Sequence, residues 1–112
     1  MTDNKNFGYL GYNFQLKLLN LIITDNVFFQ SIIDAIVSKY FDNQYFRLIM
    51  QLIKEYYEKY QTSPSFDALD QLTRIEISSE MARKNIFDML KDIKGVSFED
   101  HLFIKEKSIK FC

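Results

Sequence analysis

A helical repeat of large apolar side chains over residues 43–60 constrains the fold of this chain more than any other feature. Two adjacent stripes run along the segment at the spacing of an α-helix. They consist of Tyr45, Ile49, Leu52, Tyr56 and Tyr60, and of Phe46, Met50, Ile53 and Tyr57. Charged and amide side chains gather on the opposite face. The segment is therefore predicted to be a long amphipathic helix with its aromatic side packed in a core.

Two shorter helices are predicted before this segment. Apolar residues cover most of the circumference of residues 14–23, which predicts a nearly buried helix with Asn13 as its N-terminal cap. The polar remainder of its surface comprises Gln15, Lys17 and Asn20. A second helix can begin at Asp25 and end near Ser38. Its inward side is predicted to comprise Val27, Phe28, Ile32, Ile33 and Ile36.

Pro64 interrupts the chain after the long helix, because a proline ring disfavours helical backbone at the residue before it. Ser65 can then cap a short helix that ends near Leu72. The next segment, residues 72–80, alternates apolar and polar residues as a strand would. No second strand is available to pair with it, so a loop is predicted there.

Two more helices complete the chain. Ser78 or Ser79 can cap a helix over residues 80–94, and Gly95 is predicted to end it in the left-handed conformation. Its inward residues are predicted to be Ala82, Ile86, Met89, Leu90 and Ile93. Ser97 and Asp100 have the spacing of a capping box, which predicts that a last helix starts there. Its apolar faces comprise Phe98, Leu102, Ile109 and Cys112, and Ile104 with Phe111.

Together these elements predict an all-α fold, a compact bundle of about five or six helices whose last helix is truncated, since no stop signal precedes its end. A chain of 112 residues has the size of one domain. It is predicted to have a flexible leader over residues 1–12, a globular helical head over 13–95 and the start of a further helix over 96–112. The predicted core contains Leu19, Ile22, Phe28, Ile49, Ile53, Ile86 and Leu90.

The charge balance argues against a nucleic-acid interface. The 14 basic and 15 acidic residues give a formal net charge of −1, whereas strong DNA binding normally needs a basic surplus on one face. The chain opens without a signal peptide, and its apolar runs fall short of the ~20 residues that cross a bilayer. Cys112 is the only cysteine, so a disulfide framework is excluded. These features predict a soluble cytoplasmic protein that does not contact the membrane.

Signals for catalysis are weak. The sequence lacks the phosphate-binding motif G-x-x-x-x-G-K-[ST], and one histidine with one cysteine cannot assemble a zinc site. His101 beside Glu99 and Asp100 has the composition of a general base oriented by a carboxylate, but an exposed histidine in a first helical turn is favoured. Asp67 and Asp70 are interpreted as a solvated helix face. We predict no catalytic, cofactor-binding or metal-binding residue in this chain.

Neighbouring tyrosines form a pattern that could also serve base stacking. The rings and cations concerned are Tyr56, Tyr57 and Tyr60 with Lys54 and Lys59. Their helical spacing favours packing at the core and its rim instead. The chain is therefore expected neither to hydrolyse ATP nor to bind single-stranded DNA appreciably.

Several groups of residues recur in the order and spacing of a known family. They are Leu18 and Leu19, Asp25 and Phe28, Tyr40 and Phe41, Arg47 and Ile49, and Pro64 through Leu69. In this order the chain resembles the N-terminal domain of DnaB-type replicative DNA helicases. The closing SFEDHLFIKEKSIKF resembles the phage branch of that family. The resemblance covers residues 14–112 and consists of core patterns, which are less specific than a nucleotide-binding motif.

The resemblance implies a role as a collar domain in a hexameric ring, in the cytoplasm of a bacterial host. Such collars pair neighbouring subunits through a helical hairpin and contact primase and the helicase loader. ATP and magnesium would bind only in a motor domain that is missing from this chain, which implies a truncated piece of a longer protein or a stand-alone domain. The candidate interaction residues are Phe103, Ile104, Phe111, Arg47 and Tyr57.

Two departures and two alternatives stand beside this resemblance. Bacterial members usually carry Gly and His where this chain has Asn20 and Phe46, which favours a phage protein. One alternative is the helicase-binding domain of a DnaG-type primase, which shares the helical fold, although the polar N-terminal leader argues against a C-terminal domain. The other alternative is a small phage adaptor that binds the helicase collar.

Overall fold

The computed structural model describes residues 5–112 and has six α-helices and two 3-10 helices over this range. They are η1 (Phe7–Leu10), α1 (Tyr12–Thr24), α2 (Asn26–Ile32), η2 (Ser38–Tyr40), α3 (Gln44–Tyr60), α4 (Phe66–Glu76), α5 (Glu80–Lys94) and α6 (His101–Phe111). These residues contain no strand, so the predicted all-α class is confirmed. None of the described helices is long and apolar enough to cross a membrane.

Polar residues at the helix starts explain where most of the helices begin. The Asp25 carboxylate accepts a hydrogen bond from the backbone N–H of Phe28 at 3.0 Å, at the start of α2. Ser65 and Ser79 accept in the same way from the first turns of α4 and α5, and Asn43 from that of α3. These side chains satisfy N–H groups that have no partner inside the helix. The caps predicted at Asp25, Ser65 and Ser79 are confirmed.

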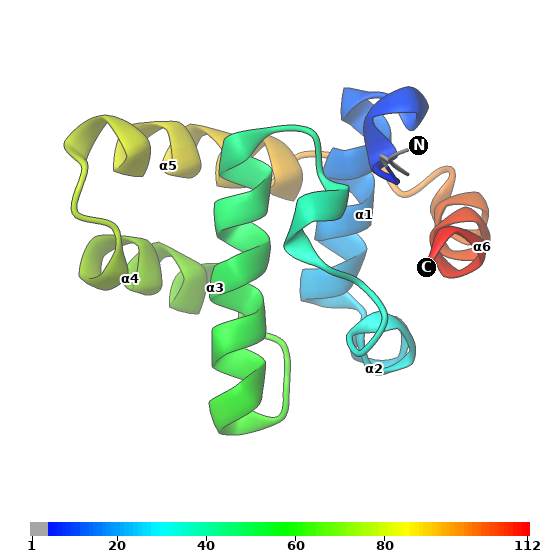
Figure 1. The fold of residues 1–112 in the computed structure, drawn as a ribbon, viewed down its shortest axis with the longest axis horizontal. Helices are drawn as coiled ribbons and strands as arrows, with labels where there is room; N and C mark the ends of the chain where they lie inside the picture. The colour runs from blue at the N-terminus through cyan, green and yellow to red at the C-terminus, as the bar shows by residue number, and fades with distance from the viewer. Residues whose placement is uncertain (1–4) are drawn as a thin grey trace.

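The helices form two sides around a shared centre. Helices α1 and α3 run vertically in Figure 1, and α5 lies across the upper part of the picture in contact with both. Helix α4 lies below α5 on the left and contacts α3 and α5 (Figure 1). Helices α2 and α6 contact α1 and lie on the right. The bundle therefore has an α4–α5 side and an α6 side, with α1 and α3 between them.

The core residues come from every one of the main helices. All seven residues predicted to be in the core are buried, with exposed fractions of 4% or less. They are Leu19, Ile22, Phe28, Ile49, Ile53, Ile86 and Leu90. Phe29, Phe41 and Phe46 are also fully buried, so most of the aromatic content serves packing.

The N-terminal segment differs from the flexible leader predicted over residues 1–12. Residues 1–4 of that leader lie outside the described residues. Downstream of them, η1 forms and its Phe7 is fully buried. The Phe7 ring lies 5.2 Å from the Phe41 ring and 4.3 Å from the Phe111 ring. One aromatic side chain thus anchors the segment in the core, and the helical head begins before residue 13.

Two helix boundaries at glycines differ in detail from the prediction. Helix α1 begins one residue before Asn13, which lies in its first turn instead of capping it. Gly11 precedes the helix with a φ of 93°, a conformation that suits glycine because it has no Cβ. Gly95 ends α5 as predicted, but its φ of −88° is not left-handed. Its N–H still closes the last turn by donating to the carbonyl oxygen of Lys91.

Helix α4 is longer than predicted. It ends at Glu76 instead of near Leu72, so most of the loop predicted over residues 72–80 is helical. Thr73 is fully buried there, and its hydroxyl donates a 2.7 Å hydrogen bond to the carbonyl oxygen of Leu69. Because this contact satisfies the polar group of Thr73, the inward face of the helix continues through a position that looks polar in the sequence.

Helix α6 is fastened by ion pairs instead of the capping box predicted from Ser97 and Asp100. Asp100 precedes α6 but makes no capping hydrogen bond, and its carboxylate pairs with Lys17 of α1 at 2.8 Å. Lys105 of α6 pairs with Asp25 at 2.6 Å. The two ion pairs join the last helix to α1 and to the start of α2.

Three residues of the first two α-helices differ from the prediction in whether they are exposed or buried. Val27, predicted to face inward, is 83% exposed on α2. Gln15 and Asn20, predicted as polar surface, are almost completely buried in α1. The Gln15 side chain accepts from the N–H of Asp42 at 3.2 Å. Buried amides occur where backbone groups of a neighbouring segment need partners.

Candidate functional site

The five residues predicted to form an interaction surface do not make one exposed patch. On α6, Phe103 is 53% exposed, but Ile104 is buried against the core. Phe111 is half-buried, because its ring packs on Phe7. The burial of Ile104 therefore conflicts with its selection as a candidate interaction residue. The physical reason is that α6 folds back onto α1, where its inward residues find apolar partners.

The two candidates on α3 make structural contacts. The Arg47 side chain donates hydrogen bonds to the carbonyl oxygens of Phe41 at 2.8 Å and Asp42 at 3.2 Å. It thereby holds the segment that leads into α3. The Tyr57 ring meets the Phe29 ring edge-on, with 5.3 Å between the ring centroids. Both side chains are half-buried, and their contacts explain them as packing residues.

The acidic residues beside His101 do not orient its ring. The Nδ1 atom of His101 lies 2.8 Å from the carbonyl oxygen of Phe98, and Asp100 pairs with Lys17. Asp67 is exposed in the first turn of α4. Over residues 5–112, no group of three or more His, Cys, Asp or Glu side chains could hold a metal ion.

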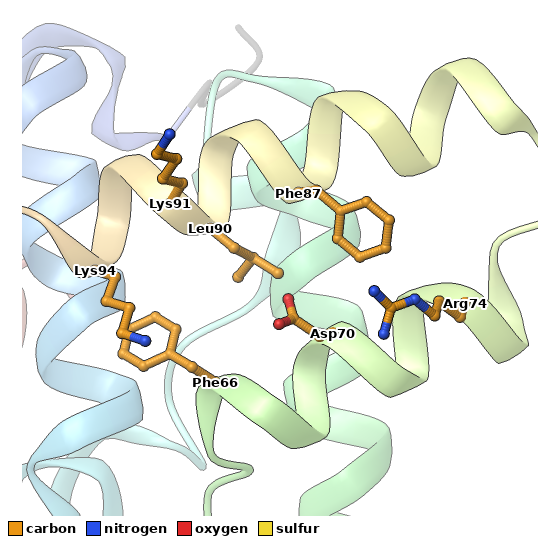
Figure 2. Close-up of a pocket in the computed structure, with 7 residues that line it drawn as sticks. All are labelled: Phe66, Asp70, Arg74, Phe87, Leu90, Lys91 and Lys94. Carbon is orange, nitrogen blue, oxygen red and sulfur yellow. The ribbon is translucent and has the colours of Figure 1, made fainter.

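A cleft of about 360 Å³ between α4 and α5 combines apolar and charged groups. We refer to it as the α4–α5 cleft. It is lined by Phe66, Asp70 and Arg74 of α4 and by Phe87, Leu90, Lys91 and Lys94 of α5. Figure 2 shows the two phenyl rings at opposite ends, with Asp70 and Leu90 between them.

Cations cover both rings of the α4–α5 cleft. The guanidinium carbon of Arg74 lies 5.2 Å from the centroid of the Phe87 ring, and the Lys94 ammonium lies 5.8 Å from that of Phe66. Lys91 lines the cleft with its stem, and its ammonium points away from Asp70 in Figure 2. Among residues 5–112 none of these cations has a carboxylate partner within ion-pair distance. The cleft therefore presents positive charge beside apolar surface.

Local structure explains why the cleft forms. Pro64 and the Ser65 cap start α4, and the buried Leu69 anchors it to the core. The turn into α5 is held by Arg83, whose guanidinium donates to the carbonyl oxygens of Ile77 at 2.8 Å and Ser78 at 2.9 Å. Because the turn is fixed, α4 and α5 contact each other, and side chains of both helices line the cleft between them.

The sequence contains a signal for this site. Phe66, Asp70 and Arg74 recur every four residues, which places them on one face of a helix. The predicted helix end near Leu72 excluded Arg74 from that face. Once α4 extends to Glu76, the three side chains line the cleft together.

A second concavity lies on the α6 side, where Asp25 and Lys105 meet. The Lys105 ammonium and then the Phe28 N–H hold the pKa of Asp25 below its ordinary value. A lowered folded-state pKa means that this stabilisation is present above the unfolded-state pKa of about 3.9 and is lost as the pH falls through the folded-state value.

Replacing Asp25 by Asn is expected to lower the free energy of unfolding by about 0.5–1 kcal/mol at pH 7, because Asn keeps the cap but loses the ion pair. Urea denaturation should show that the difference from the wild type disappears in acid. Asp88→Asn is the matched control, since Asp88 pairs with Lys84 in an exposed pair at 3.3 Å. An equal effect of both changes would contradict a special role for Asp25.

Comparison with protein-family models, with curated proteins and with solved structures finds no match for this chain.

Proposed function

We propose that this chain is the N-terminal collar domain of a hexameric replicative DNA helicase of the phage branch. Its role is to dock primase and the helicase loader and to assemble subunits during DNA replication. The observation that carries the proposal is that the residues of the resemblance hold the bundle together. Asp25 caps α2, Arg47 binds the segment before α3, and Pro64 is buried before α4.

Helix α6 supports a role in assembly. Its inner side contributes Ile104 and Ser108 to the buried part of the protein, while Leu102 is 71% exposed and Phe103 and Ile109 are about half exposed. The buried Ser108 hydroxyl has no hydrogen-bond partner among the described residues. A helix with apolar residues on two sides suits contact with its own head on one side and with another chain on the other.

In this proposal, nucleotide binding and hydrolysis take place in a motor domain outside this chain. In the full-length protein that domain would bind ATP and magnesium and unwind DNA. The chain described here would act through protein contacts, in keeping with its aromatic core and balanced charge.

Sedimentation velocity of this chain and of a chain extended along its reading frame beyond Cys112 tests the proposal. Helix α6 has 11 residues, too few to bury the ~1,200–2,000 Å² of a standard interface. We expect the 112-residue chain to be a monomer or a dimer of micromolar affinity. The extended chain should form dimers or rings and contain a nucleotide-binding motif.

Variants of α6 sharpen this test. Leu102→Glu should weaken assembly of the extended chain, because it places a charge on an exposed apolar face. Glu106→Gln is the matched control, since Glu106 only pairs with Lys110 on the surface at 3.4 Å. A tight oligomer of the short chain that persists in high salt would contradict the role of α6. A stop codon directly after Cys112 would favour the adaptor alternative.

A further inference from the structure

We propose that the α4–α5 cleft binds an acidic peptide segment of a partner protein, with an apolar side chain inserted between Phe66 and Phe87. This inference rests on the proposed docking function and names the chemistry of the partner. Its first support is the shape of the site, a cleft of about 360 Å³ with a phenyl ring at each end and Leu90 between them (Figure 2). Such a volume suits one or two apolar side chains.

The charges of the cleft determine the sign of the partner. Arg74 and Lys94 are exposed and lie over the two rings without a carboxylate partner among residues 5–112. A ligand carboxylate at either end would gain a charged hydrogen bond that the free protein leaves unmade. Lys91 adds a third positive charge at the rim. An acidic segment therefore complements the cleft, and a basic segment is repelled by it.

Asp70 distinguishes a peptide from a nucleic acid. Its carboxylate lies between the two rings in Figure 2 and makes no hydrogen bond or ion pair with the described residues. A peptide can offer backbone N–H groups to this carboxylate. The phosphate backbone of DNA has no such donor. The same aromatic and basic residues without Asp70 would suit single-stranded DNA better.

The test uses the 112-residue chain and an array of immobilised short peptides that differ in net charge and aromatic content. Binding is expected to rise with the number of acidic residues when a phenylalanine or leucine is present. It should be absent for peptides in which lysines replace the acidic residues, and weak when serines replace the apolar ones. The peptides that bind best are then measured in solution by fluorescence anisotropy.

The charge-reversal variant Arg74→Glu/Lys94→Glu is expected to weaken this binding at least about tenfold, because two attractions become repulsions. Its matched control is Lys39→Glu/Lys59→Glu, which changes the net charge equally at exposed positions outside the cleft. The control should retain binding within about twofold. Phe87→Leu tests the apolar contact and should weaken binding with little change in the melting temperature, which is measured for every variant.

Three results would overturn the inference. One is binding that does not depend on acidic residues, and another is equal weakening by the cleft and control variants. The third is tighter binding of an oligothymidylate than of every acidic peptide, which would indicate a nucleic-acid site. Peptide binding that withstands these tests would stand even if sedimentation disproved assembly into a helicase collar, so the two proposals fail separately.

Discussion

Replacing Phe46 by alanine is expected to lower the free energy of unfolding by about 3–5 kcal/mol, as for other fully buried phenylalanines. Phe46 has no exposed surface, and its ring lies 5.3 Å from the Tyr12 ring and 6.1 Å from the Phe41 ring. It thus joins α3 to the start of α1. Removing the ring leaves a cavity between elements that are fixed by other contacts, so collapse cannot recover the lost contacts.

Urea denaturation followed by far-ultraviolet circular dichroism measures this change. Gln51→Ala on the same helix is the matched control, because Gln51 is exposed. The control is expected to change the free energy of unfolding by less than about 0.5 kcal/mol. Similar losses in both variants would mean that Phe46 is not the packing centre that the structure indicates.

Asn20→Asp is expected to destabilise the fold by about 3–5 kcal/mol at pH 7 although the two side chains have nearly the same shape. The Asn20 amide is buried and donates a 3.0 Å hydrogen bond to the carbonyl oxygen of Ile93, which ties α1 to the end of α5. One carboxylate oxygen at this place would face that carbonyl oxygen with no proton between them. The other would have only the 3.3 Å contact with the Thr24 hydroxyl, which also donates to the backbone carbonyl oxygen of Asn20 at 2.8 Å. Burial disfavours its charged form, which raises its pKa in the folded state.

The loss of stability in Asn20→Asp is expected to depend on pH. A carboxyl whose pKa is raised by folding holds its proton more tightly in the folded state, so stability falls as the pH rises above the unfolded-state value of about 3.9. The deficit of the variant is therefore expected to shrink between pH 7 and pH 4, where the protonated acid can donate to Ile93 as the amide does. Equilibrium unfolding at both pH values measures it.

Asn13→Asp provides the control for Asn20→Asp. Asn13 lies on the same helix but is exposed in its first turn, where a negative charge is favourable. We expect its effect to stay within about 0.5 kcal/mol at either pH. A large, pH-independent loss in Asn20→Asp would contradict the idea that burial of charge is the cause.

The candidate site was only partly predictable from the sequence. The spacing of Phe66, Asp70 and Arg74 is visible in the sequence, but it has meaning only if α4 continues past Leu72. The alternation of apolar and polar residues over 72–80 suggested a loop instead, whereas the structure buries Thr73 and satisfies its hydroxyl within the helix. The position of α5 opposite this face depends on tertiary structure and cannot be predicted from the spacing of residues within one helix.

The sequence by itself determined the elements whose causes are local. The apolar period over residues 43–60 gave α3, and the caps at Asp25, Ser65 and Ser79 gave the starts of three other helices. Both signals act over one or two turns, so they do not depend on the rest of the chain. The core residues followed for the same reason, because the inward side of each helix is the apolar side.

Only the tertiary structure decided which residues break that pattern. Val27 is exposed although it is apolar, whereas Gln15 and Asn20 are buried although they are polar. Each amide side chain bonds to a backbone group of a distant segment, Gln15 to Asp42 and Asn20 to Ile93. A buried backbone group must find a partner wherever the fold brings it, and hydropathy along one helix does not contain that information.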